Sequence, residues 1–216
     1  MKITILALRT ARSDLLYGHF IEHFHRQIYG GVYDPGNPLS DSDGFRSDVI
    51  DAMRRIKVPI LRWPGGCFVS SYHWQKAVGP VHTPFFDKAW RVEDPNSFGT
   101  NEFIALCRKV GCEPYICTNA GTGTAEEMSD WMEYCNLESE GEFARMRIAH
   151  GYPIPHKVKY WSIGNENYGW RKSKRSSVRR PLPLWMRSTG ARTKFGVITS
   201  VVLPLTLLPR PSKSVI

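Results

Sequence analysis

Apolar residues recur at two spacings along this chain, and the two spacings predict strands that alternate with helices. Short apolar runs, typical of buried strands, occupy Leu15–Glu22, Val58–Leu61, Tyr115–Thr118 and Val158–Ile163. Between them, apolar residues fall on one face of a helix over Phe45–Lys57, Thr100–Val110, 125–135 and Glu142–Ala149. Strands joined by helices in this order predict a parallel sheet with right-handed connections.

Capping signals mark several of the predicted helix ends. Thr100 is suited to cap the second helix and Gly111 to end it. Thr124, with Glu127 three residues later, has the pattern of a capping box at the start of the third helix. The first helix is expected to bury one face, made of Val49, Ile50, Met53 and Ile56.

A polar or glycine-rich cluster follows each predicted strand. The clusters are His19–His23, Arg62–Cys67, Asn119–Thr124 and Asn165–Glu166. Chemistry gathered at the ends of successive strands is typical of a (β/α)8 barrel, and no dinucleotide-binding glycine motif follows the first strand. About four strand–helix units make half of such a barrel. We therefore predict an α/β fold in which residues 1–170 form the N-terminal half of a (β/α)8 TIM barrel.

The sequence changes character after residue 170. All 20 Asp and Glu residues lie at or before Glu166, whereas 11 of the 29 Lys and Arg residues lie in 171–216. The net charge of +9 therefore comes from this last segment. The first 170 residues give no electrostatic reason to expect a nucleic-acid or membrane partner.

We expect residues 171–216 to be an unrelated basic tail of low order, the product of a shifted reading frame or a misjoined gene. An alternative is that this tail binds nucleic acid or another acidic surface through its positive charge. It contains no recognisable nucleic-acid-binding motif.

Cysteine usage and apolar runs bear on the compartment. Five cysteines, an odd number without a CxxC pair, predict reduced thiols and not a disulfide framework or a zinc ribbon. The apolar run near Met1 is short for a signal peptide. Val197–Leu208 is interrupted by polar residues and proline and is too short to span a bilayer. Reduced thiols are typical of a cytosolic chain, so we expect a cytoplasmic protein, and we predict no cofactor. Gly121–Thr124 lacks the lysine of a phosphate-binding loop and predicts a tight strand-to-helix turn.

The sharpest chemical signal is Asn165–Glu166, at the end of the last predicted strand. A carboxylate there suits general acid/base catalysis, and the neighbouring amide can hydrogen-bond a substrate hydroxyl. The aromatic residues Tyr160 and Trp161 of the same strand would lie near the carboxylate. The alternative is a glutamate that forms a structural salt bridge.

Glu22 offers a second carboxylate at the end of the first strand, suited to sugar hydroxyls. Nearby histidines raise the alternative of a metal site, namely His19, His23 and His25. In a strand followed by a turn these histidines share no helical face, so we expect them to be hydrogen-bonded within the fold and predict no metal.

The segment Arg62–Cys67 predicts a rigid turn directly after a buried strand. Arg62 would be the charged residue at the mouth of a site, and the two glycines allow the backbone to approach closely. Cys67 is either a thiol that faces substrate or a small buried hydrophobe. Trp74 and Trp90 follow, and each would either stack on a sugar or pack in the core.

Taken together, these motifs resemble the start of the glycoside hydrolase family 51 α-L-arabinofuranosidases. The resemblance covers about residues 15–170 and rests on Tyr17–His23, Ile28–Gly31, Leu61–Phe68, Tyr72–Trp74, Gly79–Pro80, Asn96–Gly99, Glu102–Phe103, Asn119–Thr124, Trp131–Asn136 and Val158–Glu166. It implies a (β/α)8 barrel and the hydrolysis, with retention, of terminal α-L-arabinofuranosyl residues from arabinan and arabinoxylan oligosaccharides. The partner of this chain would then be an oligosaccharide that contains arabinofuranosyl residues.

The resemblance also implies roles for individual residues. Glu166 would be the general acid/base, Glu22 and Asn165 would contact the arabinose, and Cys67 would face the sugar. This chain departs from the family at two places near the site, where Lys76–Ala77 and Thr83–Pro84 replace the usual Asp-Gly and Arg-Pro.

The nucleophilic glutamate of this family lies on a later strand, and no Asp or Glu follows Glu166 in this sequence. We therefore expect a chain truncated before the nucleophile and inactive by itself, with a non-catalytic sugar-binding fragment as the alternative. The open edge of the fourth strand, with its unpaired backbone groups, would favour self-association.

Overall fold

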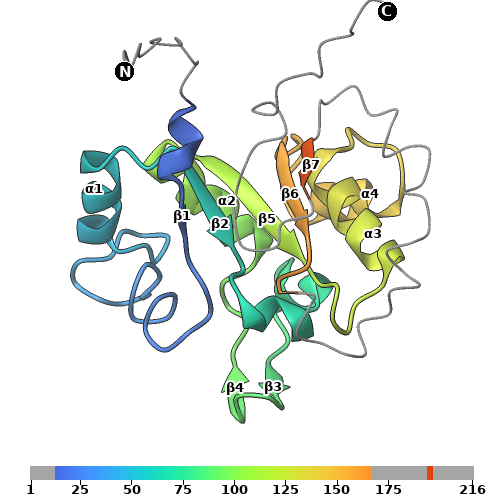
Figure 1. Cartoon of the computed structure of the whole chain (residues 1–216), viewed down its shortest axis with the longest axis horizontal. Helices are drawn as coiled ribbons and strands as arrows, with labels where there is room; N and C mark the ends of the chain where they lie inside the picture. The colour runs from blue at the N-terminus through green and yellow to red at the C-terminus, as the bar shows by residue number, and fades with distance from the viewer. Residues whose placement is uncertain (1–12, 167–193, 197–216) are drawn as a thin grey trace, which may run out of the picture.

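A sheet of five parallel strands forms the centre of the molecule, with the order β1-β2-β5-β6-β7. The structure is a computed structural model that describes residues 13–166 and 194–196 (Figure 1). The strands are β1 (His19–Phe20), β2 (Ile60–Trp63), β5 (Glu113–Thr118), β6 (Tyr160–Ile163) and β7 (Lys194–Gly196). The predicted α/β fold with a parallel sheet is confirmed.

Helices and a hairpin connect these strands. The α-helices are α1 (Ser47–Arg55), α2 (Thr100–Val110), α3 (Ala125–Asn136) and α4 (Glu142–Ala149). Three short 3-10 helices are η1 (Asp14–Tyr17), η2 (Cys67–Ser71) and η3 (Trp74–Ala77). An antiparallel hairpin of β3 (Phe85–Asp87) and β4 (Val92–Asp94) projects beyond the sheet (Figure 1). Within the described segments, no helix combines the length and hydrophobicity that crossing a bilayer would require.

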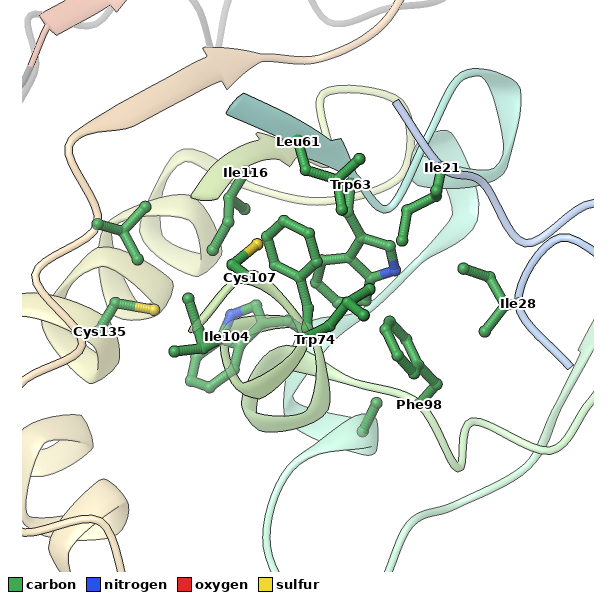
Figure 2. Packing of buried hydrophobic residues seen from close by; sticks show 14 of the residues in the cluster. Ile21, Ile28, Leu61, Trp63, Trp74, Phe98, Ile104, Cys107, Ile116 and Cys135 are labelled. Carbon is green, nitrogen blue, oxygen red and sulfur yellow. The ribbon is translucent and has the colours of Figure 1, made fainter. Parts of the chain in front are cut away.

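The two faces of the sheet differ in character. Leu61, Trp63 and Ile116 are fully buried in the core beside the helices (Figure 2). The ring of Trp63 stacks on Phe103 of α2, with centroids 5.0 Å apart. Side chains alternate between faces along a strand, so Arg62 lies on the opposite face. That face is the one that carries polar groups.

The first predicted strand is much shorter in the structure. Only His19 and Phe20 pair with β2, and the residues before them form η1. Extending the register would place Tyr17 opposite Pro59, which has no N–H to donate to a neighbouring strand. The apolar run at Leu15–Glu22 therefore did not predict the strand length.

Two details of the helix predictions are wrong. Ile56 is 61% exposed because α1 ends at Arg55 and the chain turns away. Thr100 does not cap α2, since Gly99 is the N-cap and donates its N–H to Glu102 Oε2 at 2.8 Å. The Thr100 hydroxyl instead accepts a hydrogen bond from the buried indole N–H of Trp131 at 3.0 Å.

Other helix signals are confirmed. Gly111 ends α2 with a left-handed φ of 85°, and α4 spans the predicted Glu142–Ala149. Thr124 caps α3 by accepting the N–H of Glu127 at 3.1 Å. The Glu127 carboxylate, however, pairs with the ring of His73 at 2.9 Å. All five cysteines are free thiols, as predicted.

A fifth strand, β7, was not predicted. Lys194–Gly196 pairs in parallel with β6, so β6 is not the edge of the sheet as expected. Backbone groups along β6 can hold a neighbouring strand whatever its side chains, and the sequence around Lys194 has no strand periodicity. The remaining predictions for 171–216, including low order, fall outside the described residues.

Candidate active site

A cleft of about 1030 Å³ opens where β1, β2 and β6 end. All five residues singled out by the sequence line it, namely Glu22, Arg62, Cys67, Asn165 and Glu166. They meet because parallel strands bring their C-terminal ends to one edge of the sheet, as the sequence pattern predicted. The β3–β4 hairpin adds Asp87, Trp90 and Asp94 to the rim.

Arg62 reaches from β2 across β5 to the turn that follows β6. Its Nη2 donates to Asn165 Oδ1 at 2.8 Å and also contacts Cys117 Sγ of β5 at 3.4 Å. The guanidinium carbon lies 5.8 Å from the centre of the Phe20 ring, which is within the range of cation–π attraction. Arg62 is thus a half-buried cation on the polar face of the sheet.

Cys67 and Glu166 face each other across the cleft. The Cys67 thiol donates to Glu166 Oε2 at 3.8 Å. Partial desolvation in the cleft raises the pKa of the Cys67 thiol, and the negative charges of Glu166 and Glu22 raise it further. The thiol therefore stays protonated and can donate. Because Cys67 is exposed, it is not the small buried hydrophobe that the sequence left open.

Glu166 has an unusual backbone conformation for a residue with a side chain. Its φ is 47°, in the left-handed region, two residues after Gly164, whose φ is 75°. This region costs a residue with a side chain roughly 1–2 kcal/mol, and such strain is frequent at functional sites. The turn directs the Glu166 side chain into the cleft.

Glu22 is packed against the two glycines of the turn after β2. Gly65 has φ 125°, and a Cβ added there would collide with the side chain of Glu22. A Cβ on Gly66 would lie 3.1 Å from both carboxylate oxygens of Glu22. The backbone N–H of Phe68 donates to Glu22 Oε1 at 3.2 Å. The glycines predicted to permit a close approach therefore make room for this carboxylate.

A buried polar network lies behind Glu22. Trp63 Nε1 donates to His23 Nε2 at 3.0 Å, and His23 Nδ1 donates in turn to Asp94 Oδ2 at 3.1 Å. The other oxygen of Asp94 accepts the hydroxyl of Tyr29 at 2.9 Å and the N–H of Asn96 at 2.7 Å. Burial opposes the charge, but these hydrogen bonds hold the pKa of Asp94 below its usual value.

The network shows how one of the three histidines considered as metal ligands is bonded. His23 is bonded within the fold through both ring nitrogens, as expected. Among the described residues no such bonds are found for His19 or His25. Nor does any group of three or more His, Cys, Asp or Glu side chains in 13–166 and 194–196 have an arrangement suited to a metal ion.

The aromatic residues divide between core and cleft. Trp161 is buried and meets Trp131 edge-on at 6.0 Å, and it does not line the cleft beside Glu166 as the sequence suggested. Trp74 is also in the core, where it stacks on Trp131. Trp90 is 57% exposed at the cleft rim, 6.2 Å from the ring of Phe24.

Sequence reasoning missed the hairpin that carries Trp90 and Asp94. A local signal for it was present. Asp87 accepts the backbone N–H groups of Ala89 at 2.8 Å and Trp90 at 3.0 Å. An Asp that bonds the backbone two and three residues later is typical of a turn, so Asp87 marked the reversal.

The parallel α/β sheet carries carboxylates, an amide and a guanidinium at its strand ends, where parallel α/β enzymes gather their functional groups. Residues 52–179 match the family described as "Alpha-L-arabinofuranosidase 1 domain". The chain belongs to this family and is a segment of glycoside hydrolase family 51 type.

Similar proteins agree with this assignment. Alpha-L-arabinofuranosidase C of Emericella nidulans is 47% identical over 156 residues, which are 71% of this chain and 31% of that protein. An intracellular exo-alpha-(1->5)-L-arabinofuranosidase of Acetivibrio thermocellus is 45% identical over 156 residues, with the same coverage of 71% and 31%. The chain thus spans about a third of the length of these relatives.

Solved structures show the same relationship. The alpha-L-arabinofuranosidase of Thermotoga maritima, in an arabinose complex, superposes with a TM-score of 0.79 at 47% identity. That match covers 85% of this chain and 40% of the Thermotoga maritima protein. The GH51 enzyme of Thermotoga petrophila gives a TM-score of 0.78 at 47% identity over 85% of this chain and 40% of its own.

Proposed function

We propose that this chain carries the sugar-binding and acid/base part of a retaining α-L-arabinofuranosidase. The substrates are terminal α-L-arabinofuranosyl residues of arabinan and arabinoxylan oligosaccharides. Residues 1–170 are the N-terminal half of a (β/α)8 barrel, and 171–216 are a separate basic segment. In support, the strands of the sheet follow one another in chain order, as the strands of a barrel do, and the relatives are named arabinofuranosidases.

One observation carries the proposal: the cleft gathers Glu22, Asn165 and Glu166 with a neutral thiol donor beside them. Glu166 is the general acid that protonates the leaving oxygen and then the base that activates water. The oxygen of Asn165 is occupied by Arg62, so its NH2 group donates to a sugar hydroxyl. Glu22, held by the Phe68 amide, accepts from another hydroxyl.

Cys67 and Trp90 complete the sugar-binding surface. The Cys67 thiol can turn from Glu166 to a sugar oxygen, since both face the cleft. The exposed ring of Trp90 offers a flat apolar face beside Phe24, and such faces stack on sugars. We assign Trp90 to the sugar that follows the arabinofuranosyl residue.

A retaining mechanism needs a second carboxylate, about 5–5.5 Å from the acid/base, as nucleophile. Glu22 serves the sugar, and no Asp or Glu follows Glu166 in the 216 residues. We therefore propose that the 216-residue chain binds arabinofuranosides without hydrolysing them at an appreciable rate. The second candidate function is that of a non-catalytic sugar-binding fragment, whose cleft has no part in hydrolysis, and the gathered donors and acceptors of the cleft favour it.

The test compares two proteins with 4-nitrophenyl α-L-arabinofuranoside as substrate. One is the 216-residue chain, and the other is a chimera that joins residues 1–166 to the corresponding C-terminal region of the Emericella nidulans relative. We expect release of 4-nitrophenol by the chimera only, and none from 4-nitrophenyl β-D-xylopyranoside. Fast hydrolysis by the 216-residue chain would contradict the proposal that these residues contain no nucleophile. An inactive but folded chimera would contradict the assigned activity.

Two further proposals concern the setting of the protein. We place it in the cytoplasm, in line with the intracellular relative of Acetivibrio thermocellus, and fractionation of cells with an antibody to residues 47–55 would test this. The nucleotide sequence around codon 169 tests the origin of the basic segment. A second reading frame that continues the barrel would support a frameshift, and its absence would count against one.

A further inference from the structure

The hydrogen bonds of the buried network behind Glu22 lead toward one charged acceptor, the carboxylate of Asp94. The indole N–H of Trp63 and the backbone N–H of Asn96 can only donate toward it, and the hydroxyl of Tyr29 donates to Asp94 at 2.9 Å. His23 therefore accepts at Nε2 and donates at Nδ1. Asp94 accepts the three remaining donors, on Oδ2 from His23 and on Oδ1 from Tyr29 and Asn96, which is the pattern of an ionised carboxylate. The side chains of His23 and Asp94 are 1% and 9% exposed, so water does not compete for these bonds.

This fixed histidine ring supports the segment that holds Glu22. The ring of His23 stacks on Phe68 with centroids 4.2 Å apart and planes at 7°. The backbone N–H of Phe68 is the group that donates to Glu22 Oε1 at 3.2 Å. The residue before Phe68 is Cys67, which faces Glu166. A tilt of the His23 ring would therefore move Phe68, and with it a donor to each carboxylate.

We propose that Asp94 and His23 are positioning residues of the sugar site, which act by holding Phe68 so that its amide orients Glu22. The inference rests on the proposed role of Glu22 in binding arabinose. Asp94 comes from the end of β4, so the same network also fixes the hairpin to the end of β1. The carboxylate of Asp94 then holds two parts of the cleft rim together, the β3–β4 hairpin and the segment that follows β1.

Asp94→Asn is the sharpest substitution because it keeps the size of the side chain. If its oxygen still accepts from Tyr29 and Asn96, the new NH2 group points at the N–H of His23. Either that bond is lost, or the His23 proton moves to Nε2 and meets the N–H of Trp63. Tyr29→Phe removes one donor from Asp94 and is a milder second variant. Asp51→Asn, an exposed residue of α1, is the matched control for the lost charge.

The experiment uses the full 216-residue chain labelled with 15N. Ring correlations report the tautomer of His23, and the amide resonance of Phe68 reports its bond to Glu22, with Glu22→Ala as the reference for a lost bond. We expect Asp94→Asn to change the His23 tautomer or ring resonances and to move the Phe68 amide toward its position in Glu22→Ala. Tyr29→Phe should cause a smaller shift in the same direction, and Asp51→Asn none.

Affinity for methyl α-L-arabinofuranoside is the functional readout. Asp94→Asn should weaken binding roughly tenfold, because a hydrogen bond to a charged group is disturbed, while Asp51→Asn binds as the wild type does. A folded Asp94→Asn with unchanged Phe68 amide and affinity would overturn the proposal. If Asp94→Asn does not fold, an unchanged Phe68 amide in Tyr29→Phe overturns it.

Failure of the proposed function would look different. If the wild-type chain does not bind the arabinofuranoside, the sugar site itself is contradicted. The His23 and Phe68 resonances of the variants still decide whether Asp94 positions the amide that holds Glu22. An equal shift of the Phe68 amide in Asp51→Asn would also overturn the positioning role, since it would reflect loss of charge alone.

Discussion

Arg62 of β2 donates to the side-chain oxygen of Asn165 at 2.8 Å, although Asn165 follows β6, which is not a neighbour of β2. β5 lies between them, and Arg62 spans it on the polar face of the sheet. The contact determines the orientation of the Asn165 amide. Its oxygen faces the guanidinium, and its NH2 group is the part that can meet a ligand.

Asn165→Asp should weaken binding of methyl α-L-arabinofuranoside about tenfold or more. The substitution keeps an oxygen for Arg62 but replaces the NH2 donor by an acceptor, so a hydrogen bond to the sugar is lost. The melting temperature should not fall, because Arg62 gains a carboxylate partner. Gln75→Glu, at an exposed position, is the matched control. Unchanged affinity in titration calorimetry would remove Asn165 from the sugar site.

Gly65→Ala and Gly36→Ala separate backbone strain from crowding at Glu22. Both glycines have positive φ, 125° and 86°, but a Cβ on Gly36 meets nothing within 4 Å whereas one on Gly65 collides with Glu22. We expect Gly36→Ala to lower the free energy of unfolding by roughly 1 kcal/mol and Gly65→Ala by roughly 2–4 kcal/mol. Urea denaturation measures both. Equal losses would mean that Glu22 moves away freely.

Glu166→Ala in the active chimera should slow the hydrolysis of substrates with poor leaving groups far more than that of substrates with good ones. A good leaving group such as 4-nitrophenolate departs with little help from a proton, whereas a sugar alcohol needs one. The ratio of kcat/KM for 4-nitrophenyl α-L-arabinofuranoside to that for an arabino-oligosaccharide should therefore rise. A variant slowed equally on both substrates would show that Glu166 is not the general acid.

Acid should destabilise the fold through His156. Burial, with the charges of Arg108 and Arg147 nearby, lowers the pKa of His156 to about 3. Its Nε2 bonds to Asn101 at 3.0 Å, while Nδ1 has no hydrogen-bond partner within the described part of the chain. An unfolded histidine titrates near pH 6.5, so between pH 6.5 and 3 the unfolded state binds more protons and stability falls as pH falls.

Urea titrations at pH 7 and pH 4.5 test this effect. The contribution of His156 to the loss should be about 2–3 kcal/mol. His156→Gln cannot take up the proton, so it should be less stable than the wild type at pH 7 but show a smaller loss on acidification. The same loss in both proteins would assign the acid sensitivity to other groups.

Exposed apolar residues beside β1 should promote self-association. β1 is the first strand in the order of the described sheet, and Leu16 and Phe20 next to its edge are 51% and 50% exposed. Unpaired strand edges with apolar neighbours favour pairing between chains. We expect sedimentation velocity to show dimers or larger species that increase with concentration, and Leu16→Lys to reduce them. A monodisperse wild-type monomer would contradict this.

The sequence by itself determined the order of elements and the edge of the sheet that carries the chemistry. Strands alternating with amphipathic helices permit a parallel arrangement, and parallel strands place their ends together. Glu22, Arg62 and Asn165 could therefore be assigned to one cleft without coordinates. Local chemistry was sufficient for Gly111, since only a residue without Cβ adopts its left-handed conformation at low cost.

Tertiary structure alone decided which groups bond across the cleft. The Arg62–Asn165 bond spans 103 residues of sequence and the Cys67–Glu166 contact 99, and no local pattern encodes such distances. The ring of Trp161 faces the core because strand register, not composition, selects its side of the sheet. β7 is held by backbone hydrogen bonds, which leave no side-chain pattern to read.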